Sequence, residues 1–194
     1  MPPATAITEP ARVELYNLKD DGRMPNNTAL PAMVYHGALR PAEDGDDDDP
    51  ARIFEETFAA NGWRGGWRDG IFPYHHYHST SHEVLGIARG EARVRLGGEG
   101  GVTTEVKAGD VIVIPAGVGH RNLGASPDFL VVGAYPEGQE DYDLCRGRDH
   151  DERARALEAI ARVPLPATDP VYGAGGPLIE HWHGRAPEEE EEAS

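Results

Sequence analysis

The stretch GIFPYHHYHSTSHEVLGIARG, residues 70–90, and the stretch GDVIVIPAGVGH, residues 109–120, decide how this chain folds. Side chains alternate along an extended strand, so His76 and His78 are predicted to point to the same face. A polar Ser-Thr-Ser turn follows and leads into an apolar strand that begins with a glutamate. The second stretch holds a four-residue apolar strand and a Pro-Ala-Gly turn that ends in a histidine. Both stretches therefore predict a β framework that carries imidazole and carboxylate groups.

Four side chains of these stretches are candidate metal ligands, namely His76, His78, Glu83 and His120. A lone histidine on a strand is more often structural, but three imidazoles and a carboxylate together are a transition-metal ligand set. The ligand types do not choose among Fe, Mn, Ni, Zn, Co and Cu. Four protein ligands would leave one or two coordination positions for a small molecule.

The spacing resembles the two sequence motifs of the cupin superfamily. The first cupin motif is G, five residues, H-x-H, four residues, E, six residues, G, and residues 70–90 match it at every position. The second motif is matched through His120, but its final asparagine position holds Gly124, and Asn122 lies two residues earlier. This departure concerns the local turn after His120. The further segments VYHGAL, VVGAYPEGQ and VPLPATDPVYG extend the resemblance, over residues 12–182, to the YjlB-like group of small cupins.

The resemblance implies an all-β fold, a cupin jelly-roll β-barrel with short flanking helices. One domain is expected over residues 1–194, with the barrel core at about 63–135 and an acidic disordered tail at 184–194. The N-terminal strands and a C-terminal helix and strap are expected to pack on this core. Because many small cupins are dimers, a homodimer is also expected.

The flanking elements follow from the sequence itself. Strands are expected at Val13–Leu18 and Met33–Leu39. Asp49 and Pro50 predict the start of a helix, because Asp favours the cap position and Pro the first turn. Its buried stripe is predicted to be Ile53, Phe54, Thr57 and Phe58. A second helix is expected at Asp151–Arg162, and its apolar side is predicted to be Ala154, Leu157, Ile160 and Ala161.

Composition excludes several classes of partner. The chain has 34 acidic and 18 basic residues and a formal charge of −16. An acidic chain does not favour nucleic acid or an anionic membrane surface, because both attract basic proteins. The single cysteine, Cys145, cannot form an intramolecular disulfide, and neither a signal peptide nor a membrane-spanning stretch is apparent. A cytoplasmic protein is therefore expected.

Two classes of function remain open for a site of this kind. The first is a small-molecule metalloenzyme, dioxygenase-like or isomerase-like, and the second is a non-catalytic cupin that binds a small ligand. A general acid or base beside the ligands would favour the enzyme, and the nearby candidates are His75, Tyr77 and His82. Arg93 and Arg95 alternate on one predicted strand and could bind a carboxylate substrate, although a solvent-facing edge is the more common place for such arginines.

Overall fold

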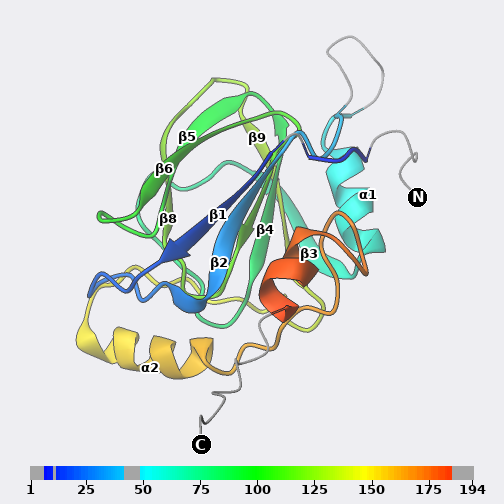
Figure 1. Ribbon diagram of the computed structural model, residues 1–194. Helices are drawn as coiled ribbons and strands as arrows, with labels where there is room; N and C mark the ends of the chain where they lie inside the picture. Colours follow the sequence, from blue (N-terminus) through cyan, green and yellow to red (C-terminus); the bar gives the residue numbers. More distant parts are fainter. Residues whose placement is uncertain (1–6, 11, 42–48, 185–194) are drawn as a thin grey trace, which may run out of the picture.

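The computed structural model describes residues 7–10, 12–41 and 49–184, and it places two antiparallel sheets against each other (Figure 1). The larger sheet has the order β1-β2-β7-β4-β9-β3, with bounds Arg12–Leu18, Asn27–His36, Val111–Ile114, Glu83–Arg89, Leu130–Pro136 and Trp63–Asp69. The smaller sheet has the order β6-β5-β8, with bounds Val102–Lys107, Glu91–Leu96 and His120–Ala125. The predicted jelly roll is confirmed, although in the described part of the chain the two sheets are not hydrogen-bonded into one closed barrel.

Alternation along the strands creates two hydrophobic clusters, one on each face of the larger sheet. Leu85, Ile87 and Ile112 point to the inner face, where they pack with Val94 and Leu96 of the smaller sheet. The outer face carries the intervening residues of the same strands, which form the second cluster. Because Glu83 shares its face of β4 with Leu85 and Ile87, its carboxylate lies at one end of the space between the sheets.

Helix α1, Arg52–Ala60, covers the outer face of the larger sheet, and its four buried residues are the predicted stripe of Ile53, Phe54, Thr57 and Phe58. The helix begins at Arg52, one turn after the predicted Asp49 cap, although the Asp49 side chain still accepts a hydrogen bond from the Ala51 amide. Phe54 lies so close to β4 that a Cβ on Gly86 would come within 2.2 Å of its ring. Glycine at this position therefore lets the helix pack on the sheet.

The C-terminal segment also packs on the outer face of the larger sheet. It ends in one π-helical turn, η1, Ile179–His183, in which Trp182 is buried and donates a hydrogen bond to the Pro31 carbonyl at 3.0 Å. Figure 1 shows this segment in orange and red beside β3. It thus covers apolar strand residues that would otherwise meet water.

Helix α2, His150–Ile160, lies below the sheets in Figure 1, and its predicted apolar side was wrong. Ala154 and Leu157 are exposed, Leu157 to 44%, whereas Ala156 is buried and Ile160 partly buried. Ala156 packs in a small cluster with Met24 and Tyr77, and Ile160 packs against that cluster. Polar contacts also fix the helix, because Asp149 caps the Glu152 amide and the Glu152 carboxylate accepts hydrogen bonds from the Arg146 and Gly147 amides.

Other predicted boundaries are close to the observed ones. The strand predicted at Val13–Leu18 is β1, but the strand predicted at Met33–Leu39 begins earlier and ends earlier, as β2, Asn27–His36. Residues 42–48 and the predicted acidic tail from residue 185 onward lie outside the described residues. Among the described helices, none is long and apolar enough to cross a membrane.

Candidate metal centre

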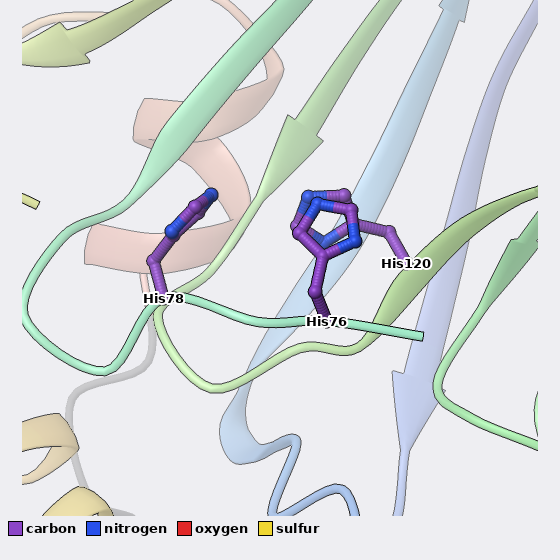
Figure 2. A group of neighbouring side chains, drawn as sticks. All are labelled: His76, His78 and His120. Atoms are coloured by element: carbon purple, nitrogen blue, oxygen red, sulfur yellow. The ribbon is translucent and has the colours of Figure 1, made fainter. Parts of the chain in front are cut away.

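The H-x-H segment is extended and sits between the two sheets. His76 pairs with His120 through two backbone hydrogen bonds of 3.2 and 2.9 Å, and Tyr77 pairs with Cys145 in the same way. This pairing holds the imidazoles of His76 and His78 on one side of the segment (Figure 2). Tyr77 packs on the other side, in a buried cluster with Met24 and Cys145, as the alternation predicts.

A tight turn delivers the third histidine to the same place. Gly117 has φ +92°, and a Cβ there would come within 2.4 Å of the Asn26 carbonyl, so the turn requires glycine. The Gly117 amide donates to the His78 carbonyl at 2.8 Å, which ties the turn to the H-x-H segment. Strand β8 then begins with His120. The strand continues after it through a bulge at Leu123, with Asn122 accepting a hydrogen bond from the Gly124 amide at 2.8 Å. This bulge lies where the sequence departs from the second motif.

His76, His78 and His120 form a buried group whose ligand atoms all lie within 4.8 Å of one another. The ring centroids of His76 and His120 are 4.0 Å apart, and Figure 2 shows all three rings raised to the same side of the backbone. Such a group could hold a metal ion.

Backbone carbonyls fix how each imidazole is protonated. The Nδ1 atoms of His76 and His120 lie 3.0 Å from the carbonyls of Tyr74 and Val118, and His78 Nδ1 bonds to the Asp143 carbonyl. A carbonyl only accepts, so Nδ1 must carry the hydrogen in each ring, and the neutral ring presents the lone pair of Nε2 to the shared space. This is the tautomer that a metal-binding imidazole needs.

Glu83 is the fourth predicted ligand, and it lies beside this group. Its Oε2 atom is 3.3 Å from His78 Nε2 and 3.2 Å from His120 Nε2. Yet Oε2 is fully buried and has no hydrogen-bond donor, because in the tautomer described above the neighbouring Nε2 atoms carry lone pairs and no hydrogen. A buried carboxylate oxygen without a donor is costly, and a cation in the shared space would remove that cost. The donor set therefore fits a divalent transition metal.

The protonation states of Glu83 and the histidines also favour a bound cation. Burial raises the pKa of Glu83, but the neighbouring His78 and His120 outweigh it and keep this pKa well below its usual range. Burial lowers the pKa of His78, and Glu83 more than reverses this, so the net direction is upward. Burial and the neighbouring His120 lower the pKa of His76 to about 3. The site thus holds a carboxylate that attracts positive charge and at least one imidazole that stays neutral.

The other oxygen of Glu83 is fixed by two residues that the sequence did not single out for the site. Tyr135 donates from its hydroxyl to Glu83 Oε1 at 3.1 Å, and Trp67 donates from Nε1 to the same hydroxyl at 2.8 Å. The ring of Tyr142 stacks on Tyr135 at 4.3 Å between centroids and meets His78 edge-on at 5.0 Å. No local spacing marks these residues, since they lie on β3, on β9 and in the following loop.

The four predicted ligands and the two tyrosines line one cavity of about 510 Å³. The three predicted acid or base candidates lie outside it. His75 bonds to Glu99 at 2.8 Å, Tyr77 donates to Glu152 on α2 at 3.3 Å, and His82 accepts from the Ala116 amide at 2.9 Å.

The two arginines that could have bound a substrate also lie elsewhere. Arg93 is exposed, and Arg95 bonds to Thr103 and to the carbonyls of Gly98 and Glu99. Neither residue lines the cavity, as the more common placement of strand arginines suggested.

Comparisons with known proteins agree with the fold. The cupin domain family matches residues 68–131. The uncharacterized protein YjlB of Bacillus subtilis (strain 168) is 44% identical over 169 residues, which cover 87% of this chain and 96% of the relative.

Solved structures resemble the chain more loosely. Acireductone dioxygenase from Bacillus anthracis, with a cadmium ion in its active center, is 18% identical over 50% of this chain and 68% of its own, with a TM-score of 0.38. An uncharacterized protein with a double-stranded β-helix domain from Klebsiella pneumoniae is 26% identical over 41% of this chain and 70% of its own, with a TM-score of 0.31. Similarity at this level carries no argument about activity.

Proposed function

We propose that this chain, which belongs to the YjlB-like family of cupins, is a small-molecule metalloenzyme of the dioxygenase-like or isomerase-like kind. Its metal ligands would be His76, His78, Glu83 and His120. One observation carries the proposal: three buried imidazoles keep Nδ1 on backbone carbonyls, and the Nε2 atoms of His78 and His120 lie 3.3 and 3.2 Å from a buried carboxylate oxygen that lacks a hydrogen-bond donor. A bound divalent metal would supply a Lewis acid, or a redox centre if it is Fe, Mn or Cu.

The residues around the ligands would orient the site and shield it. Tyr135 would hold the Glu83 carboxylate in place, and Trp67 would hold Tyr135. Burial and Glu83 raise the pKa of Tyr135, so its hydroxyl stays protonated and donates a hydrogen bond at neutral pH.

A second candidate is a cupin that binds a small ligand without turnover. It is favoured by the position of His75, Tyr77 and His82, since none of these groups reaches the cavity. Beyond the metal ligands, Tyr135 and Tyr142 are the hydroxyl-bearing residues among the described ones that line the cavity. The two candidates therefore share the metal and differ in chemistry.

Metal analysis of protein purified without chelator or affinity metal is the first test. About one equivalent of a transition metal per chain, lost in His120→Ala, is expected. Full-length protein without metal, which takes up none from excess Zn²⁺ or Fe²⁺ under anaerobic conditions, would contradict both candidates. A redox metal would favour the oxygenase, and zinc would favour the isomerase or the binder.

The same proposal includes a cytoplasmic homodimer. Strand β1 forms an edge of the larger sheet, with Leu15 exposed to 41%, and an exposed strand edge with apolar side chains favours pairing with a second copy. Light scattering at micromolar concentration should give twice the mass of the chain. A monomeric mass would contradict the homodimer.

A further inference from the structure

Apolar side chains line most of the cavity beyond the histidines. Ile71, Leu85 and Leu144 line it together with Phe72, and the rings of Tyr135 and Tyr142 add aromatic surface. Leu85 and Ile71 belong to the buried cluster between the sheets, so this part of the wall is rigid. A ligand that enters the cavity therefore meets hydrocarbon on several sides.

The rim of the cavity exposes unusually large apolar groups. Phe72 is exposed to 45%, Tyr142 to 42% and Leu144 to 46%. All three are large apolar side chains that are exposed to solvent, and all three line this cavity. Apolar groups gathered at a cavity mouth mark a binding site for an apolar ligand.

The described side chains that line the cavity offer no free lysine or arginine to an anionic ligand. Among the described residues, Arg68 is the one lysine or arginine that lines it. All of its guanidinium nitrogens are engaged, Nε and one terminal nitrogen with Glu55 at 2.6 and 2.7 Å and the other with Asp49 at 2.5 Å. Recognition of carboxylate or phosphate ordinarily uses a free arginine fork, which is missing here. The carboxylates of Asp69 and Glu83 add negative charge instead.

We propose that the cavity binds an uncharged ligand with a planar aromatic ring, and that Phe72 and Tyr142 are its specificity-determining residues. The ring would lie against these two side chains, and an oxygen of the ligand would point toward the three imidazoles. This inference rests on the proposed function only for the ligand's oxygen end, because the aromatic contacts do not involve the metal.

Matched probes test the cavity walls in metal-free full-length protein at pH 8. 2-Naphthamide and 2-naphthoate share shape and differ in charge, and acetamide keeps the amide without the ring. Calorimetry or ligand-observed NMR should show 2-naphthamide binding about tenfold more tightly than 2-naphthoate, a difference of about 1.4 kcal/mol. Acetamide should not bind measurably. Equal or tighter binding of 2-naphthoate would overturn the proposal, and so would a failure of 2-naphthamide to bind.

Single substitutions then locate the bound probe. Tyr142→Ala and Phe72→Ala should each weaken 2-naphthamide binding about three- to tenfold, since each removes one aromatic contact. Leu165→Ala is the control, because Leu165 is equally exposed, at 44%, and does not line the cavity. If both rim variants bind 2-naphthamide as the unmodified protein does, the proposal is wrong. Because these measurements use no metal, they can succeed even if metal analysis contradicts the proposed function.

Discussion

At the scale of single residues, three backbone carbonyls orient the three imidazoles, and these carbonyls come from three separate parts of the sequence. Tyr74 and Val118 lie two residues before the histidines they hold, but the carbonyl that holds His78 belongs to Asp143. The orientation of the imidazoles therefore depends partly on local turns and partly on the loop that follows β9.

Replacement of a single ligand is the most direct prediction at this scale. Each of His76→Ala, His78→Ala, Glu83→Ala and His120→Ala should weaken metal binding more than about 100-fold, which exceeds the usual effect of a residue that only supports a ligand. Equilibrium titration with Zn²⁺ against a competing chelator measures the loss. His75→Ala is the control, because its ring bonds to Glu99 and not to the group. Metal loss in His75→Ala with retention in His76→Ala would show that the other face of the segment binds the ion.

Asp143 provides a second prediction at the residue scale. Its carboxylate accepts hydrogen bonds from the Ser79 amide, at 2.6 Å, and from the Ser79 hydroxyl, while its carbonyl accepts from His78 Nδ1. Asp143→Ala removes the carboxylate and frees this loop, so metal affinity should fall about 10- to 100-fold. Asp141→Ala, at an exposed neighbouring position, should leave the affinity unchanged.

Imidazole ¹⁵N spectra show whether Asp143→Ala weakens metal binding through the tautomer of His78 or through a loss of protein stability. In the unmodified metal-free protein, His78 should show a hydrogen on Nδ1 at a pH where it is neutral. In Asp143→Ala this tautomer should no longer dominate. If affinity falls with the His78 tautomer unchanged, Asp143 would act through stability and not through the ring.

At the scale of elements, regular patterns were predictable and docking by polar contacts was not. The apolar strand Val111–Ile114 and the buried stripe of α1 were predicted residue by residue, because side-chain period follows directly from backbone geometry. The four candidate ligands came from motif spacing, and the structure brings them to one cavity. Whether they bind metal stays a prediction.

What the sequence did not reveal comes from contacts between distant segments. Tyr135 and Tyr142 reach the cavity only because β9 lies beside β4 and β3, which no local spacing shows. The predicted face of α2 was wrong because Glu152, through its hydrogen bonds, and the small residue Ala156 define the docked side, whereas Leu157 faces water.

The orientation of α2 gives the prediction at this scale. Leu157→Ser should change the free energy of unfolding by less than about 0.5 kcal/mol, because the side chain already meets water. Ala156→Leu should cost about 1–3 kcal/mol, because Ala156 is buried against Met24 and Tyr77 and extra volume does not fit. Urea unfolding of both variants measures the two values. A larger loss of stability in Leu157→Ser than in Ala156→Leu would support the apolar side that was predicted from the sequence.

At the scale of the whole molecule, the candidate site adjoins the core through Ile71 and Leu85, but its four ligands lie outside the apolar clusters. The two hydrophobic clusters extend over both faces of the larger sheet, and the four candidate ligands belong to neither of them. A protein whose core is complete without an ion should fold without it, in contrast to a small metal-dependent domain.

Metal removal tests this separation. Chelation should leave the far-ultraviolet circular dichroism unchanged, because no strand of either sheet needs the ion for its hydrogen bonds. Thermal stability should fall, because a ligand that binds only the folded state adds about 2.7 kcal/mol at a free concentration 100 times its dissociation constant. Glu83→Gln is the informative variant: it removes the buried charge and the ligand together, so its stability should be insensitive to metal and at least equal to that of the metal-free unmodified protein. Loss of β structure on chelation would show that the ion is structural, and the cavity would then be part of the scaffold.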